Sequence, residues 1–130
     1  MAKQVIVTDK AAGSSGPISQ AVRVGELVFT AGAVGALPST GKLVRPGLEA
    51  EARQALDNLR HVLDAAGSCL DCVAKVTVYL TDIGDRPVFN QIYREYFPQE
   101  YPARTAVQVV ALAGGARVEV EAVAAVCDHG

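Results

Sequence analysis

One arginine and two glutamates near the end of the chain could together act on a carboxylate. Arg104 follows the loop Tyr101-Pro102-Ala103 and begins an apolar strand, where its planar guanidinium could make two parallel charge-assisted hydrogen bonds. We expect an antiparallel partner strand to carry Glu119 and Glu121 and to turn them toward the same edge. A carboxylate there could orient a water molecule. The pattern therefore predicts hydrolysis of a small acid.

Composition limits the class of protein. The chain has 130 residues, half of them hydrophobic, which suits a single domain spanning 1–130. Its 12 basic and 14 acidic side chains form no basic run, so we do not expect nucleic-acid binding. The first eight residues lack the apolar stretch of a signal peptide, and no segment could span a bilayer. An odd number of cysteines, three, argues against a disulfide framework and favours the cytoplasm.

Hydrophobic periodicity predicts strands, a helix, a strand, a second helix and two closing strands. The first helix, 48–66, repeats apolar residues at helical spacing before Gly67, and the second begins at Asp85-Arg86-Pro87 and ends at Pro98. In 73–80, Val76, Val78 and Leu80 alternate with polar residues, as in a half-buried strand. The remaining strands are predicted at 5–7, 18–24, 27–31, near Leu43, 104–112 and 117–127, the last two joined by a turn at 113–116.

The element order indicates an α+β fold with both helices on one face of a mixed sheet. The other face would carry valine, alanine and threonine side chains. Because burial of apolar surface contributes about 25 cal/mol per Å², we expect that face to be covered by self-association. Clefts between the copies are then natural places for a small-molecule site.

Several motifs occur in the order typical of one protein family. The chain resembles the Rid family (the RidA/YjgF group) of enamine/imine deaminases over nearly its whole length. The segments that carry the resemblance are GPISQAV (16–22), TAG (30–32), ARQALDNL (52–59), VAKVTVYL (73–80), FN (89–90), YPAR (101–104) and VEVEAVA (118–124).

This resemblance implies a chorismate-mutase-like fold and a homotrimer whose sheets pack into a central barrel, with three active sites at the subunit interfaces. It implies hydrolysis of 2-iminopropanoate or 2-iminobutanoate to the 2-oxo acid and ammonia. No metal or organic cofactor is expected for this reaction.

The family motifs also imply roles for individual residues. Arg104 matches the arginine that binds the substrate carboxylate, and Glu119 matches the acidic residue that positions the attacking water. Glu121 has the same strand parity, so parity alone leaves both glutamates open, and the motif favours Glu119. The other expected substrate-binding positions are Ile18, Ala31, Gly32, Asn90, Thr105 and Ala106.

Three of these positions depart from the usual pattern of the family. Ile18 stands where many members carry tyrosine, Ala31 where many carry serine, and Ala106 where many carry cysteine. The pocket should therefore be more apolar and have fewer hydrogen-bond donors. We expect it to accept imines with larger apolar side chains as well as the imine derived from alanine.

Other functions remain open from the sequence. One alternative is an endoribonuclease that inhibits translation, which the near-neutral charge disfavours. Another is a non-catalytic trimer that binds small carboxylates, for which Arg104 alone would suffice. Cys69 and Cys72 form a C-x-x-C pair that could make a Cys3His zinc set with Cys127 and His129, but nothing in the sequence joins the two segments. We therefore expect thiols without a metal.

Overall fold

The computed structural model describes residues 2–45 and 47–127. This part of the chain contains two α-helices and seven strands. In chain order the elements are β1 (Gln4–Ile6), β2 (Ala21–Val24), β3 (Leu27–Thr30), β4 (Ala33–Val34), α1 (Gly47–Ala65), β5 (Val73–Leu80), α2 (Arg86–Tyr96), β6 (Ala103–Gln108) and β7 (Val118–Ala125). Short 3₁₀ turns lie at η1 (Leu70–Cys72), η2 (Ile83–Asp85) and η3 (Ala113–Gly115).

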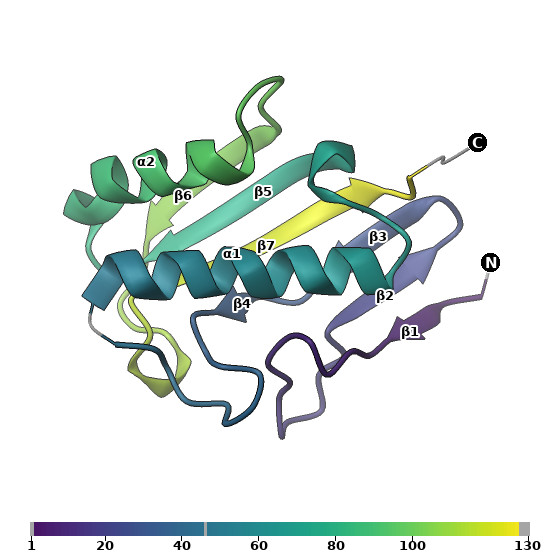
Figure 1. The fold of residues 1–130 in the computed structure, drawn as a ribbon, viewed down its shortest axis with the longest axis horizontal. Coiled ribbons are helices and arrows are strands. Elements are labelled where there is room, and N and C mark those ends of the chain that lie inside the picture. The colour runs from purple at the N-terminus through teal and green to yellow at the C-terminus, as the bar shows by residue number, and fades with distance from the viewer. Residues whose placement is uncertain (1, 46, 128–130) are drawn as a thin grey trace.

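The strands form one sheet in the order β1-β2-β3-β7-β5-β6, and β4 pairs with β7 beside β3. All neighbouring pairs are antiparallel except β5 and β6, which are parallel. The parallel pair follows from its connection, because α2 carries the chain back across the sheet before β6 begins. Both helices lie on the same face of the sheet (Figure 1). The mixed α+β fold predicted from the sequence is confirmed.

The ends of α1 follow from its sequence. Glu49 supplies a negative charge to the first turn, where it complements the helix dipole. At the other end Gly67 has a φ of 82°. Its N–H donates to the carbonyl of Asp64, and the N–H of Ser68 donates to the carbonyl of Leu63. This is the Schellman arrangement, and it confirms Gly67 as the stop predicted for this helix.

The start of α2 differs in detail from the prediction. Pro87 lies in the first turn as expected, since proline costs no hydrogen bond there. An aspartate just before a helix is expected to cap it, and Asp85 occupies the cap position, but its side chain makes no capping hydrogen bond. Asp82 accepts a hydrogen bond from the N–H of Gly84 instead and opens η2. The extra 3₁₀ turn therefore takes over the capping interaction.

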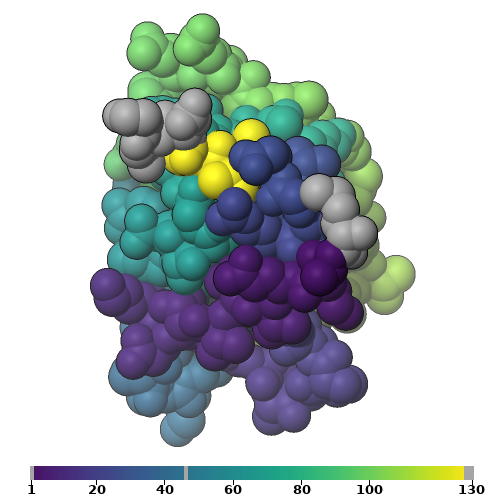
Figure 2. Space-filling view, turned by 90° about the vertical axis from the view of Figure 1, so that its right-hand side faces the viewer, coloured from purple at the N-terminus to yellow at the C-terminus, as the bar shows by residue number. Residues whose placement is uncertain are grey.

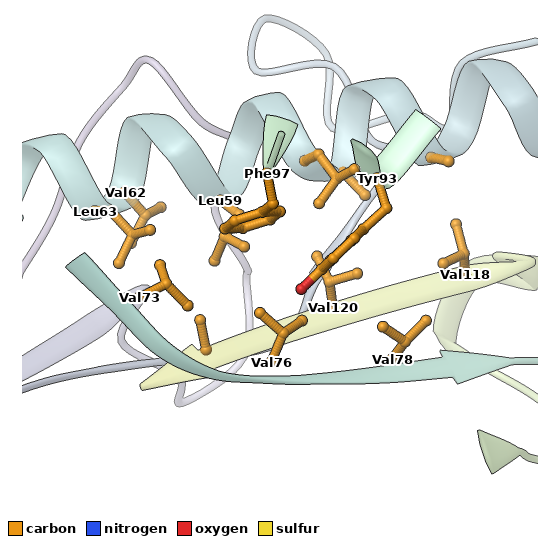
Figure 3. Packing of buried hydrophobic residues seen from close by; sticks show 14 of the residues in the cluster. Leu59, Val62, Leu63, Val73, Val76, Val78, Tyr93, Phe97, Val118 and Val120 are labelled. Carbon is orange, nitrogen blue, oxygen red and sulfur yellow. The ribbon is translucent and has the colours of Figure 1, made fainter. Parts of the chain in front are cut away.

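The core lies between the helices and one face of the central strands. Figure 3 shows Tyr93 and Phe97 of α2 and Leu59 of α1 pointing toward valines of β5 and β7. Val76, Val78 and Leu80 are fully buried there, as the alternation predicted. Their neighbours Lys75, Thr77 and Tyr79 point to the opposite side of the sheet, which neither helix covers. We call this second side the open face.

Most predicted elements agree with the structure except at their ends, but β4 was not predicted, the strand near Leu43 is not formed and one predicted pairing is wrong. The strand expected at 18–24 begins only at Ala21, and the strand expected near Leu43 is a single bridge to Ala36. We expected the two closing strands to be neighbours, and this is wrong, because β5 lies between β6 and β7.

The open face exposes apolar side chains, with Val5 52% and Phe29 40% accessible. None of the helices within the described residues has the length and apolar character needed to cross a membrane.

Candidate functional site

Arg104 lies near the start of the edge strand β6, on the face that the helices cover. Its register partner on β5 is the buried Val76, so both side chains point toward α2. The guanidinium carbon is 4.7 Å from the centre of the Tyr93 ring and 5.8 Å from that of Phe89. Such stacking holds the planar fork in one orientation.

One hydrogen bond further orients the Arg104 guanidinium. Its Nη2 donates to Oδ1 of Asn90 over 2.6 Å. Burial lowers the pKa of Arg104, and the neighbouring Arg86 and Arg94 act in the same direction, yet a guanidinium stays protonated at any ordinary pH. Within the described residues Asn90 is its only hydrogen-bond acceptor, so the remaining donors can bind a carboxylate.

A hollow of about 210 Å³ opens beside this guanidinium. Its lining residues are Asn90, Tyr93, Arg94, Tyr101, Pro102 and Arg104. They include two arginines and no acidic residue, so the hollow favours an anion. We call it the arginine hollow. The ring of Tyr93 packs against the guanidinium of Arg104, a role that the sequence analysis did not identify.

Glu119 lies on β7 but on the open face. Val118 and Val120 on either side of it are fully buried beneath the helices, so Glu119 points the other way. Its carboxyl group packs against Gly32, where a Cβ would lie 2.5 Å from Cδ of Glu119. Burial raises the pKa of Glu119, and the negative charge of Glu121 raises it further. A carboxylate with a raised pKa is a better proton acceptor.

Glu121 shares the open face with Glu119 but has a different partner. The hydroxyl of Tyr79 donates a hydrogen bond to Oε1 of Glu121. This bond raises the pKa of Tyr79, because it favours the protonated phenol. The structure therefore separates the two glutamates that strand parity left open: Glu121 is paired with a tyrosine, and Glu119 faces a hollow.

The hollow at Glu119 is broad, about 800 Å³. Its walls are the loops before β2 and after β4, the segment 30–34, and Asn58, Leu59 and Val62 of α1. The predicted site residues that line it are Ile18, Ala31, Gly32 and Glu119. Ile18 is 59% exposed, an unusual value for such an apolar side chain. We call this hollow the glutamate hollow.

The predicted site residues thus fall into two groups within one chain. Arg104 and Asn90 line the arginine hollow, and no residue of that hollow lines the glutamate hollow. The expectation that Glu119 faces the edge holding Arg104 is wrong for a single chain. One reason is that β5 separates their strands (Figure 1). The other is that the two side chains point to opposite faces, since Arg104 pairs with the buried Val76 and Glu119 with Tyr79.

Thr105 and Ala106, also predicted as site residues, line neither hollow. Thr105 points to the open face, where its hydroxyl accepts a hydrogen bond of 2.8 Å from Nζ of Lys75. Ala106 has the parity of Arg104 and packs at the margin of the core. Neither side chain contacts the arginine hollow within one chain.

The family model described as endoribonuclease L-PSP matches residues 8–126. The chain belongs to this family. It is the Rid family indicated by the sequence motifs, and the predicted membership is confirmed. A human relative named 2-iminobutanoate/2-iminopropanoate deaminase is 48% identical over 122 residues, which are 94% of this chain and 89% of the human one.

Two solved structures show how closely the fold is shared. RidA from an Antarctic Psychrobacter is 43% identical, with a TM-score of 0.91 over 94% of this chain and 98% of that one. TdcF from E. coli, solved with bound serine, is 34% identical, with a TM-score of 0.89 over 94% of this chain and 98% of that one.

Proposed function

We propose that the protein hydrolyses reactive 2-imino acids, among them 2-iminopropanoate, 2-iminobutanoate and larger analogues, to 2-oxo acids and ammonia. Relatives from human and mouse, each 48% identical, bear the name of this deaminase activity. The observation that carries the proposal is the pair of hollows, one offering the oriented guanidinium of Arg104 and the other the half-buried carboxyl of Glu119. These are the two groups that the hydrolysis of an imino acid needs.

A homotrimer would bring the two hollows together between subunits, Arg104 of one copy meeting Glu119 of the next. Three features support this part of the proposal. Each hollow holds only half of the chemistry, the side chains of Arg104 and Glu119 point to opposite faces of the sheet, and the open face exposes Val5, Phe29 and Val107. Covering these apolar side chains would stabilise the assembly by about 25 cal/mol for each Å² buried.

In the proposed mechanism Arg104 binds the substrate carboxylate through two parallel N–H donors. The imine, protonated on nitrogen, is already electrophilic at carbon, so no covalent nucleophile is required. Glu119 accepts a proton from a water molecule whose oxygen attacks that carbon. Protonated Glu119 then returns this proton to the nitrogen of the carbinolamine. As the C–N bond breaks, the carboxylate takes the hydroxyl proton, ammonia leaves and the 2-oxo acid forms, and the proton on Glu119 passes to solvent. Positioning of carboxylate and water accounts for most of the rate acceleration.

The other site residues would surround this reaction. Gly32 and Ala31 would approach the substrate through their backbone next to Glu119, and Ile18 would contact its side chain. Asn90 would keep the guanidinium in place. Thr105 and Ala106 follow Arg104 on the same strand, and we propose that their backbone groups reach the substrate at the completed interface.

The test is a coupled assay in which an amino-acid oxidase produces the imine and semicarbazide traps what remains. We expect the protein to suppress semicarbazone formation. Arg104→Ala and Glu119→Gln should each reduce this suppression about 100-fold or more. Glu121→Gln is the matched control, since it neutralises the neighbouring glutamate of the same strand and should keep most activity at neutral pH.

Equal losses in the Glu119 and Glu121 variants would contradict the assignment of the water-positioning role. The trimer is tested separately by the molar mass in solution, from light scattering on a sizing column. A monomer with full activity would contradict an active site shared between subunits.

A non-catalytic carboxylate-binding protein is a second candidate, which the serine bound in the structure of TdcF favours. It needs Arg104 but not Glu119. Calorimetry with a 2-oxo acid distinguishes the two. A binding protein should lose affinity only in Arg104→Ala and suppress no semicarbazone, whereas a hydrolase loses turnover in both variants.

The name of the matching family model favours a third candidate, an endoribonuclease. The near-neutral chain offers little attraction to phosphates. Cleavage of a labelled RNA that disappears in Glu119→Gln would support this candidate, and cleavage that persists in that variant would point to a contaminant. We keep the cytoplasm as the proposed location because three cysteines, an odd number, argue against a disulfide framework.

A further inference from the structure

All three cysteines of the chain meet at one point, although more than fifty residues separate Cys127 from Cys69 and Cys72. Cys69 and Cys72 flank η1, between α1 and β5, and Cys127 follows the end of β7. Sγ of Cys127 is 2.6 Å from Sγ of Cys69 and 2.7 Å from Sγ of Cys72. The sulfurs of Cys69 and Cys72 are 3.5 Å apart. No cysteine lines the arginine hollow or the glutamate hollow.

The backbone holds these segments together independently of the sulfur atoms. The N–H of Cys127 donates to the carbonyl of Gly67 over 2.9 Å, and the hydroxyl of Ser68 donates to the carbonyl of Ala125 over 2.6 Å. The N–H of Cys72 donates to the carbonyl of Cys69 over 3.1 Å and closes the turn between them. Figure 2 shows the end of β7, in yellow, on the surface beside the teal segments. The thiols are therefore brought together by the fold.

The number of sulfur atoms that meet here indicates whether the cluster suits a disulfide or a metal ion. A disulfide uses two cysteines and leaves the third unused, whereas a thiophilic cation uses all three. Two of the distances are shorter than the roughly 3.5–4.0 Å at which nonbonded heavy atoms make contact. Within the described ranges, no other group of three or more histidine, cysteine, aspartate or glutamate side chains brings its donor atoms together in this way.

We propose that Cys69, Cys72 and Cys127 form a zinc-binding site that ties the end of β7 to the segment between α1 and β5. The C-x-x-C spacing is that of many structural zinc sites. All three side chains are half-buried, so a water molecule can supply the fourth ligand of the tetrahedron. His129, the fourth ligand considered from the sequence, lies outside the described residues. Binding replaces each S–H bond by a Zn–S bond and releases the protons.

The geometry needs one adjustment to accept the ion. With Zn–S bonds of about 2.3 Å, tetrahedral coordination separates the sulfurs by about 3.8 Å. Cys69 and Cys72 are already close to this spacing at 3.5 Å. Sγ of Cys127 must move outward by about 1 Å, which a rotation of its side chain allows because the residue lies beyond the last strand. The turn at η1 therefore provides two ligands in place, and the third closes on the metal.

The experiment uses the full chain without a histidine tag, fully reduced and kept free of oxygen. Titration with Co²⁺ should produce intense thiolate-to-metal absorption that saturates at one equivalent, and Zn²⁺ should abolish it stoichiometrically. Zinc should also raise the Tm. The serine variants of Cys69, Cys72 and Cys127 should each bind at least about 100-fold more weakly. Asp71→Asn is the control, since it changes a carboxylate within the motif and leaves three thiols, and it should bind normally.

Two results would overturn the proposal: no cobalt absorption in the reduced protein, or absorption that persists in Cys127→Ser. Isolation of the protein with a Cys127 disulfide, two hydrogen atoms lighter and without zinc, would instead identify the cluster as a redox pair. These readouts do not depend on imine hydrolysis. Activity of the cysteine variants measured beside them separates failure here from failure of the proposed function.

Discussion

The carboxyl group of Glu119 occupies space that any side chain on Gly32 would take. A Cβ at Gly32 would lie 2.5 Å from Cδ of Glu119 and 2.6 Å from its Oε2. Both residues lie in the glutamate hollow. Gly32 comes just before β4, and Glu119 lies on β7 opposite Val34 of β4. The glycine therefore defines where the carboxylate is held.

Gly32→Ala should displace this carboxylate and disturb the position of the attacking water. Because a misplacement of about 1 Å can cost about 100-fold in rate, we expect a loss of that order in kcat/KM in the imine-trapping assay. Gly13→Ala is the control, since a Cβ there meets no atom within 4 Å. Normal activity of Gly32→Ala would show that catalysis does not depend on the position at which Gly32 lets the Glu119 carboxylate lie.

The acid limb of the activity profile should reflect Glu119. Burial and the charge of Glu121 raise its pKa, and only the ionised carboxylate accepts a proton, so activity should fall below a pH higher than the ordinary glutamate pKa. Glu121→Gln removes one of the two causes and should move the limb to lower pH. A pH–rate profile of both proteins checks this. An acid limb at the same pH in both proteins would show that the ionisation of Glu119 does not cause it.

The same raised pKa makes a prediction about stability. The folded state holds the Glu119 proton more tightly than the unfolded state, so the free energy of unfolding decreases as the pH rises through the two pKa values. Glu119→Gln carries no charge to desolvate and should be more stable than the unmodified chain at neutral pH. Urea unfolding should show this difference, and it should vanish at a pH below both pKa values.

Arg104→Lys tests whether the shape of the cation matters as well as its charge. Lysine keeps the charge but loses the planar fork, the stacking on Tyr93 and the paired hydrogen bonds. A hydrogen bond to a charged group contributes about 1.5–3 kcal/mol, so kcat/KM should fall about 10- to 100-fold. Arg94→Lys, in the same hollow, should change it little. Full activity of Arg104→Lys would show that the site needs only a positive charge at this position and not the planar guanidinium.

The apolar lining of the glutamate hollow should widen the range of substrates. Ile18 and Ala31 both lie there and offer no side-chain hydrogen-bond donor. We expect the imine derived from leucine to be hydrolysed at a rate comparable to that derived from alanine. Ile18→Tyr should shift the preference toward the smaller imine. Relative rates from competing substrates measure this, and a strict preference of the unmodified chain for the alanine imine would contradict it.

The sequence alone determined the properties that depend on neighbours along the chain. The alternation in 73–80 predicted which side chains of β5 are buried, and Gly67 predicted the end of α1, because strand parity and left-handed backbone are local effects. Motifs in the same sequence identified the family and named Arg104 and Glu119.

Only the tertiary structure decided how distant segments meet. Insertion of β5 between β6 and β7 separated the strands of Arg104 and Glu119, the register turned the two side chains to opposite faces, and pairing of β7 with β5 brought Cys127 to Cys69 and Cys72. Strand order depends on which apolar faces pack best across the whole sheet. Each strand carries the pattern of its own burial but no local signal that names its neighbour.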